Sequence, residues 1–345
     1  MKHEGMMNKE QKILLSHGNG GRMMHDLIET VFLKYFGNEI LNEQTDAAIL
    51  PADAPNLAFT TDSFVIDPLF FPGGNIGKLA VCGTVNDLAV SGAIPRYISV
   101  SMIIEEGFPM NDLETIVKSL ADEARNAGVA IVTGDTKVVN KGKCDKLFIN
   151  TAGIGMVGNR ESQVGKAKNI MPGDVIIING TIGDHGMAVM NARESFNFKS
   201  AVLSDCASLN HLIREVMDQS DGVKFMRDPT RGGVATVLNE LAGKINLGIE
   251  IGESTLPIGG GVKAMCEILG FDPLHIANEG KVLIVAGQDE AGHILEIMKK
   301  NKLGEQSAVI GHITGDHPGR VVLKTETGGR RIVDILTGDP LPRIC

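Results

Sequence analysis

Two kinds of hydrophobic pattern alternate in the first half of this sequence, and their alternation limits the folds that the chain can adopt. The runs LAFTTDSFVI and RYISVSMII are strand-like, whereas residues 76–92 place apolar side chains along one helical face. A second helix is predicted over residues 111–127, where Asn111 and Glu114 have the spacing of a capping box. The strand VAIVTG follows it and runs into Asp135. The first half is therefore predicted to mix strands with helices.

A polar stretch, GNRESQVGKAKNIMPGD, separates the two halves of the chain. The second half begins with the strand VIIING and ends in the hairpin RVVLKTETGGRRIVDI. These signals predict an N-terminal domain at residues 1–160, a C-terminal domain at residues 161–334 and a tail at residues 335–345. Two prolines in the tail LTGDPLPRIC exclude a helix and a central strand, so we expect an extended, semi-rigid arm that carries Cys345.

The composition argues against several classes of function. A formal charge of −9 argues against a protein that neutralises nucleic-acid phosphates over a broad surface. No apolar run approaches the roughly 20 residues of a membrane span, and the N-terminus lacks the pattern of a signal peptide. The five cysteines form no CxxC pair, so neither a zinc site nor a disulfide framework is indicated. We therefore expect a cytoplasmic, reduced protein with no nucleic-acid or membrane partner.

Four aspartates lie where a strand or a helix is predicted to end beside small residues, namely Asp46, Asp62, Asp87 and Asp135. Carboxylates that converge at such positions repel one another unless a divalent cation lies among them. Mg²⁺ held by carboxylates and phosphate oxygens is the usual solution, so the pattern indicates a magnesium site. The alternative is that each aspartate caps its own turn.

Glycine accounts for 42 of the 345 residues, which favours sharp turns and close approaches of the backbone to a ligand. The stretch SHGNGGRMMHDLI places three glycines before an amphipathic helix, where bare N–H groups could face phosphates: Gly18, Gly20 and Gly21. It is not a Rossmann fingerprint, because Met23 stands where a third glycine is needed. In RDPTRGG, Asp228 and Arg231 precede another helix, and the Arg-Gly-Gly step could bring a guanidinium and amides to one phosphate.

The stretches NDLAVSGA and GDT, together with the glycine-rich N-terminal segment, resemble the superfamily of aminoimidazole ribonucleotide synthetase, selenophosphate synthetase and thiamin-phosphate kinase. Within it, the sequence is similar to the HypE family of hydrogenase maturation factors. That resemblance is carried by LSHGNGGRMMHDLI, TGDTKVV, TIGDHG, DPTRGG, ANEGK and, above all, the terminal PRIC. It covers the whole chain apart from about the first dozen residues.

The resemblance implies an α+β protein of two domains with PurM-like architecture. The N-terminal domains would pair their sheets into a β-barrel across a homodimer, and the C-terminal domain would be an α/β sandwich. ATP and Mg²⁺ would bind in the cleft between the domains. A HypF-type carbamoyltransferase would load Cys345 with a carboxamide, ATP-dependent dehydration would convert it to a thiocyanate, and a HypC–HypD complex would accept the cyano group for the iron of [NiFe]-hydrogenase.

The resemblance also assigns roles to residues. Asn86 and Thr136 join the glycines and aspartates above in binding ATP, Cys345 carries the substrate, and either Glu279 or Lys137 acts as the base that removes the nitrogen protons. Holding the substrate on the chain's own end would make the reaction intramolecular. Two alternatives remain open: a small-molecule phosphotransferase like selenophosphate synthetase, which the absence of a cysteine before Cys82 disfavours, and a non-catalytic scaffold whose terminal thiol is a tether.

Overall fold

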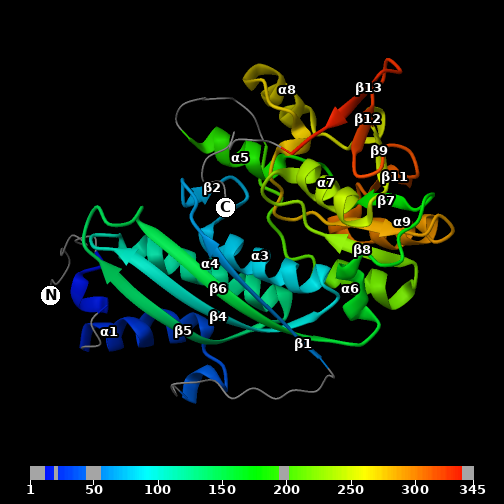
Figure 1. Cartoon of the computed structure of the whole chain (residues 1–345). Helices are drawn as coiled ribbons and strands as arrows, with labels where there is room; N and C mark the ends of the chain where they lie inside the picture. The colour runs from blue at the N-terminus through cyan, green and yellow to red at the C-terminus, as the bar shows by residue number, and fades with distance from the viewer. Residues whose placement is uncertain (1–11, 19–21, 44–55, 194–201, 336–345) are drawn as a thin grey trace.

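A computed structural model describes residues 12–18, 22–43, 56–193 and 202–335. Strands form a four-stranded sheet in the first half of the chain and a seven-stranded sheet in the second half, and helices cover both (Figure 1). The expected mixture of helices and sheets is therefore present. The expected boundary at residue 160 lies between the last strand of the first sheet and the first strand of the second.

The first sheet has the order β1-β6-β4-β5, in which only the β4–β5 pair is parallel. The second sheet has the order β13-β12-β9-β11-β7-β10-β8, in which only the β12–β9 pair is parallel. The strands are β1 (Asn56–Phe64), β2 (Phe70–Phe71), β3 (Gly74–Asn75), β4 (Ile94–Glu105), β5 (Ala130–Val139), β6 (Leu147–Val157), β7 (Val175–Ile178), β8 (Val223–Arg227), β9 (Gly248–Gly252), β10 (Leu283–Ala286), β11 (Ala308–Thr314), β12 (Val321–Lys324) and β13 (Arg330–Val333).

The helices confirm the main predictions from periodicity, including the two long helices of the first half. They are α1 (Arg22–Leu27), a π-helical segment η2 (Ile28–Leu33), α2 (Lys34–Phe36), α3 (Ile76–Val90), α4 (Met110–Ala127), α5 (Asp184–Ala192), α6 (Asn210–Gln219), α7 (Gly233–Ile245), α8 (Gly260–Leu269) and α9 (Ala291–Lys300). Short 3-10 turns are η1 (Leu15–Gly18), η3 (Leu41–Glu43), η4 (Glu161–Lys166), η5 (Glu253–Thr255), η6 (Pro273–His275) and η7 (Lys302–Gly304).

The predicted capping box at the start of α4 is wrong. The N-cap of this helix is Pro109, and its side chain makes no capping hydrogen bond. The Glu114 carboxylate instead accepts hydrogen bonds from the Tyr35 hydroxyl at 2.6 Å and from Lys34 Nζ at 2.5 Å. A tertiary contact with the N-terminal helices therefore takes the place of the local cap.

Helix α3 is the centre of the first domain and the element that joins the two domains. Thirteen of its fifteen residues are buried, so the helix is covered nearly all round. It packs against the first sheet and α4, and also against α6 and β8 of the second domain (Figure 1). It begins after Asn75, whose side-chain oxygen accepts from the backbone N–H of Gly77 at 2.9 Å. The first sheet can lie close because Gly153 on β6 has no Cβ, which would lie 2.5 Å from a Thr84 methyl carbon.

Hydrophobic cores cross from one domain to the other. One core contains α3 and α4 residues of the first domain together with Met187, Val262 and Ile276 of the second. Another contains Ala89 and Val90 of α3 together with residues of α6 and α9. The second sheet separates this core from a further one built around α7. These shared cores fix the orientation of the domains and therefore the shape of the cleft between them.

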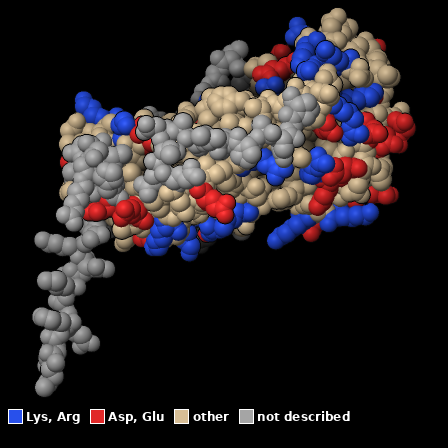
Figure 2. All heavy atoms as spheres, turned by 90° about the horizontal axis from the view of Figure 1, so that it is seen from below, with Lys and Arg blue, Asp and Glu red and all other residues tan. Residues whose placement is uncertain are grey.

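The surface carries both signs of charge. Figure 2 shows lysine and arginine side chains interspersed with aspartate and glutamate on the face seen from below. Within the described ranges, no helix combines the length and the apolar character needed to cross a bilayer.

Candidate functional site

A cleft lies where the first domain meets the second, between β1, the end of α3 and the segment after β8. Its cavity has a volume of about 270 Å³. The lining residues mix aspartates, an arginine, hydroxyl groups and apolar side chains: Ala58, Phe59, Thr60, Asp87, Leu88, Val90, Ser91, Gly165, Phe225, Met226, Arg227 and Asp228. Residues from both domains therefore form one polar cavity.

Two of the predicted metal ligands, Asp62 and Asp87, lie together beside this cavity. The alternation of β1 turns Thr60 and Asp62 toward α3, which carries Asp87 near its C-terminal end. The Thr60 hydroxyl donates to Asp87 Oδ2 at 2.8 Å, and the Thr84 hydroxyl lies 3.4 Å from Asp62 Oδ2. Strand β1 and helix α3 thus bring two carboxylates together that are 25 positions apart in the sequence.

A third carboxylate, Asp228, comes from the second domain directly after β8 and is 9% exposed. Burial and then the charge of Asp87 raise the pKa of Asp62 to about 6. Burial and then the same charge raise the pKa of Asp228 to about 7. Burial raises the pKa of Asp87 as well, against the hydrogen bond from Thr60. Burial therefore disfavours the ionised form of all three groups, and the charge of Asp87 adds to this for Asp62 and Asp228, which is the electrostatic signature of a site that accepts positive charge.

Oxygen donors of this kind fit a hard divalent cation such as Mg²⁺, which takes one or two carboxylates together with phosphate oxygens. Over the part of the chain that the structure describes, no three histidine, cysteine, aspartate or glutamate side chains are grouped closely enough to enclose a metal ion. The protein carboxylates would accordingly act together with a phosphate ligand. Two arginines supply positive charge nearby and oppose part of the rise in pKa of the carboxylates. Arg227 acts in this way on Asp87, and Arg231, exposed at the turn before α7, acts on Asp62.

Glu279 approaches the same group from the loop between η6 and β10. The residue is 3% exposed, and its Oε1 atom has no hydrogen-bond partner. Burial, followed by the nearby Cys206, Asp205, Asp228 and Asp62, raises the pKa of Glu279 well above its ordinary range. A buried carboxyl group with a free acceptor is costly unless a ligand completes its hydrogen bonds. Glu279 is therefore a candidate for exchanging a proton with a ligand bound at this cleft.

Asn86 lies between the domains, and its side chain is occupied by the protein backbone. Its Nδ2 donates to the carbonyl oxygens of Ala207 at 3.0 Å and Glu279 at 3.2 Å, and its Oδ1 accepts from the N–H of Leu209 at 2.8 Å. Both N–H bonds of the amide are used in these contacts. The residue was expected to bind the nucleotide, which stays a prediction; the structure shows its side chain in contact with the loop of Glu279.

Asp135, Thr136 and Lys137 lie at the opposite edge of the first sheet. The register aligns Asp135 with Ser101, Ser101 with Asn150 and Asn150 with Ser63, so three strand spacings of about 4.8 Å separate β5 from β1. Lys137 Nζ contacts Asp135 Oδ1 at 2.8 Å, and this hydrogen bond holds the pKa of Asp135 below its ordinary value. One subunit therefore does not bring these residues to Asp62.

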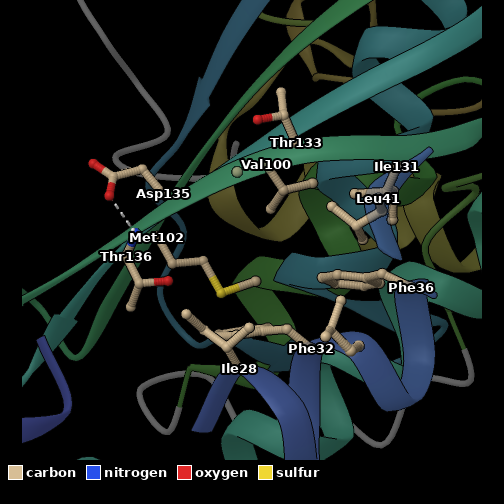
Figure 3. Close-up of a pocket in the computed structure, with 12 residues that line it drawn as sticks. Ile28, Phe32, Phe36, Leu41, Val100, Met102, Ile131, Thr133, Asp135 and Thr136 are labelled. Atoms are coloured by element: carbon tan, nitrogen blue, oxygen red, sulfur yellow. Dashed lines mark hydrogen bonds between the residues drawn. The ribbon is translucent and has the colours of Figure 1, made fainter. Parts of the chain in front are cut away.

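Beside Asp135 lies a second, apolar cavity of about 150 Å³ between β5 and the N-terminal helices. Figure 3 shows Phe32 and Phe36 on one side of it, with Val100 and Met102 opposite and Asp135 at the rim, directed away from the cavity. The Asp135 carboxylate accepts from the backbone N–H of Thr136 at 2.8 Å (Figure 3). This cavity contains no charged side chain other than that aspartate.

Several of the expected site residues lie outside the described residues: Gly20, Gly21, Asp46 and Cys345. Gly18 ends the turn η1, just before that segment. The proposed arm that carries Cys345 is likewise outside the described part of the chain.

Asp205, which no sequence motif marks, is placed by the structure beside Glu279. Its carboxylate accepts from the backbone N–H groups of Glu279 and Gly280, each at 3.2 Å, and lies 3.1 Å from Lys281 Nζ. Burial alone raises the pKa of Asp205, but the Lys281 ammonium, followed by His185, holds it below its ordinary value. Lys281 stands in the stretch ANEGK, two residues after Glu279, whereas Asp205 lies in an irregular segment with no recognisable pattern.

Two family models match the chain. The N-terminal domain of AIR synthase related proteins matches residues 44–157, and their C-terminal domain matches residues 171–324. A protein of Bradyrhizobium diazoefficiens named carbamoyl dehydratase HypE is 49% identical over 332 residues, which cover 96% of this chain and 95% of that protein.

Solved structures agree with these matches. The crystal structure of a hydrogenase maturation protein HypE in complex with ATP has a TM-score of 0.92 and 44% identity, covering 96% of this chain and 99% of that one. A chain in the crystal structure of a HypE–HypF complex has a TM-score of 0.77 and 50% identity, covering 90% of this chain and 99% of that one. These similarities extend over both domains and the cleft.

Proposed function

This chain belongs to the HypE family of carbamoyl dehydratases, which have the two PurM-like domains of AIR synthase related proteins, and we propose that it dehydrates a carboxamide carried on its own Cys345 at the expense of ATP. The product is a protein-bound thiocyanate, which supplies the cyanide ligand of [NiFe]-hydrogenase. The observation that carries this proposal is the meeting of three carboxylates and an unpartnered, buried Glu279 at one interdomain cleft.

The chemistry explains why ATP is needed. The oxygen of a carboxamide cannot leave as hydroxide or oxide at neutral pH. Attack of that oxygen on the γ-phosphorus releases ADP and converts the oxygen into part of a phosphate, which is a much better leaving group. The C–O bond then breaks as the nitrogen loses its protons, leaving a C≡N bond on sulfur and free phosphate. The elements of water are thus removed, and the oxygen leaves with the phosphate.

The aspartates of the cleft hold the triphosphate end of the nucleotide. One or two of Asp62, Asp87 and Asp228, together with phosphate oxygens, would hold Mg²⁺, which offsets the charge of the phosphates when bound. Their raised pKa values follow from burial and, for Asp62 and Asp228, also from the charge of Asp87, and they fall when positive charge enters the cleft. Arg231, together with the backbone amides of the turn before α7, adds positive charge for the transferred phosphoryl group.

Glu279 is the proposed base for the nitrogen protons. An N–H of the carboxamide would donate to Oε1, the atom that has no protein partner. Because burial raises its pKa, the carboxylate form of Glu279 is a stronger base than an exposed glutamate. Lys137 is the second candidate, and it can take part only if another subunit brings it to the cleft.

We propose that the active enzyme is a homodimer whose N-terminal sheets pair through their open faces. The face of the sheet turned away from α3 exposes large apolar side chains, with Phe59 70%, Leu57 58% and Ile103 43% exposed. The register places Asp135 and Lys137 on this same face, because Lys137 pairs with Ile103. Pairing of the sheets would bury the apolar residues and turn both polar ones toward the partner subunit.

The tether explains the position of the substrate at the end of the chain. A carboxamide held on Cys345 reacts at a high effective concentration, and the arm must leave the cleft to be loaded and unloaded. A HypF-type carbamoyltransferase would load it, as the solved HypE–HypF complex of the family suggests. A HypC–HypD complex would then accept the cyano group.

The test of this proposal follows the mass of the C-terminal peptide. Treatment with cyanate places a carboxamide on Cys345, and addition of Mg²⁺ and ATP should remove the mass of one water from that peptide. Cys345→Ala should show no such change, while it binds ATP as tightly as the unaltered protein. A carboxamide that persists indefinitely in the presence of ATP would refute the proposal.

A further inference from the structure

Given the proposed function, we infer that Asn86 and Asp205 are positioning residues that hold the backbone of Glu279 from both sides and leave its carboxyl group free for the substrate. Asn86 belongs to the first domain and Asp205 to the second. Together they connect the helix that carries Asp87 to the loop that carries the base.

Asp205 holds the backbone N–H groups on both sides of Glu279. Its side chain is 4% exposed and accepts from the consecutive N–H groups of Glu279 and Gly280, each at 3.2 Å. The Lys281 ammonium, 3.1 Å away and also largely buried, balances its charge. The backbone can approach this closely because residue 280 is glycine: a Cβ there would lie 1.9 Å from the carbonyl oxygen of Asp205.

Asn86 holds the backbone carbonyl group of Glu279. Its amide donates to the Glu279 carbonyl oxygen at 3.2 Å, and its bonds to Ala207 and Leu209 connect it to the segment that contains Asp205. The residue is 2% exposed. Since both of its N–H bonds are committed to backbone oxygens, it has no donor left for a nucleotide.

The consequence for catalysis is geometric. Because Asn86 precedes Asp87 on α3, a single helix sets both the place of one phosphate-binding carboxylate and the place of the base. None of these contacts uses the Glu279 carboxyl group, whose Oε1 remains without a partner. Loss of the contacts would move the base relative to the bound phosphates, and a displacement of about 1 Å is sufficient to reduce a rate about 100-fold.

The experiment compares Asn86→Ala and Asp205→Asn with Glu123→Gln, using the full-length protein carboxamidated with cyanate. Glu123 is a matched control, because its carboxylate accepts hydrogen bonds from Ser208 of the same interdomain segment and does not contact Glu279. The Ser208 N–H donates to Glu123 Oε1 at 3.2 Å and the Ser208 hydroxyl donates to it at 2.6 Å. Three quantities are measured: the single-turnover rate of water loss with ATP, the affinity for a non-hydrolysable ATP analogue, and amide hydrogen exchange in the peptide that contains Glu279.

We expect Asn86→Ala and Asp205→Asn to lose water about 100-fold more slowly and to exchange the Glu279 amide faster, with analogue affinity within about threefold of the unaltered protein. Glu123→Gln should behave like the unaltered protein. Weakened analogue binding in parallel with the rate would overturn the assignment of Asn86 and restore a nucleotide-binding role. Unchanged rates and exchange in both variants would overturn the whole inference.

The outcomes separate this inference from the proposed function. If the unaltered protein removes no water, the proposed function fails, and hydrogen exchange still decides whether the two residues hold the Glu279 loop. If Asn86→Ala does not fold, Asp205→Asn carries the test, because asparagine keeps the shape of aspartate.

Discussion

Replacing Asp228 by asparagine should stabilise the unliganded protein at alkaline pH, although it removes a residue of the proposed active cleft. Burial and the charges of Asp87 and Asp62 raise the pKa of Asp228 from its ordinary 3.8 to about 7. A raised carboxyl pKa adds stability that is fully present below pH 3.8 and is lost as the pH rises through 7. A difference of about 3 units corresponds to about 4 kcal/mol at pH 8. The asparagine side chain cannot ionise, so the variant should avoid up to that cost.

The assay is thermal unfolding of the two proteins at pH 5 and pH 8 without nucleotide. At pH 5 the folded Asp228 is protonated, but the unfolded carboxyl, with its ordinary pKa of 3.8, is already largely ionised, so the variant should melt higher by less than half of the full effect. At pH 8 the variant should melt several degrees higher, and Mg²⁺ with an ATP analogue should raise the melting temperature of the unaltered protein more than that of the variant. Asp316→Asn, at an exposed position, is the control. A variant that gains no stability between pH 5 and pH 8 would contradict the electrostatic reasoning.

Three further predictions concern the catalytic loop and the dimer. Glu279→Gln should slow water loss by a factor of about 10² to 10⁴ while the affinity for an ATP analogue stays within about threefold, and an active variant would exclude Glu279 as the base. Gly280→Ala should unfold at lower temperature and lose activity, because its Cβ would lie 1.9 Å from a carbonyl oxygen, whereas Gly243→Ala, with nothing within 4 Å, should do neither. If Lys137 acts across the dimer, Lys137→Ala should be inactive, and mixing it with inactive Asp62→Asn subunits should restore about a quarter of the activity; no activity should return if each subunit is self-sufficient.

Local sequence patterns predicted the regular elements well because those elements depend on side-chain periodicity. The strands β1, β4 and β5 and the helices α3 and α4 all lie where the period of two or 3.6 residues placed them. The start of α4 was the exception, since Glu114 is used by Tyr35 and Lys34 from a distant segment. For α3 the pattern indicated one apolar face, whereas the helix is buried nearly all round. Small residues such as Gly83 cover its other faces, and their burial depends on neighbours that periodicity does not specify.

The site was harder to predict than the elements, because aspartates with the same local setting lie in different places. Asp62 and Asp135 both belong to strands next to small residues. The strand order puts them at opposite edges of the sheet, and the register puts them on opposite faces. Neither property is encoded near the residues themselves. Asp205 has no local sequence pattern that marks it as a site residue. Its contact with the Glu279 backbone arises only because the fold brings an irregular segment next to that loop.

The hydrophobic cores shared by the two domains hold together the carboxylates whose ionised forms are disfavoured in the cleft. Carboxylates whose pKa values are raised by burial and mutual charge would move apart if their supports were flexible. Here the supports are β1, α3 and β8. Helix α3 contacts both strands and contributes residues to cores in both domains. The chain therefore keeps the three carboxylates close at a cost in stability, which positive charge and a bound triphosphate can offset. Because the same helix also holds the loop of Glu279, the proposed mechanism places the relief of this repulsion beside the proposed base.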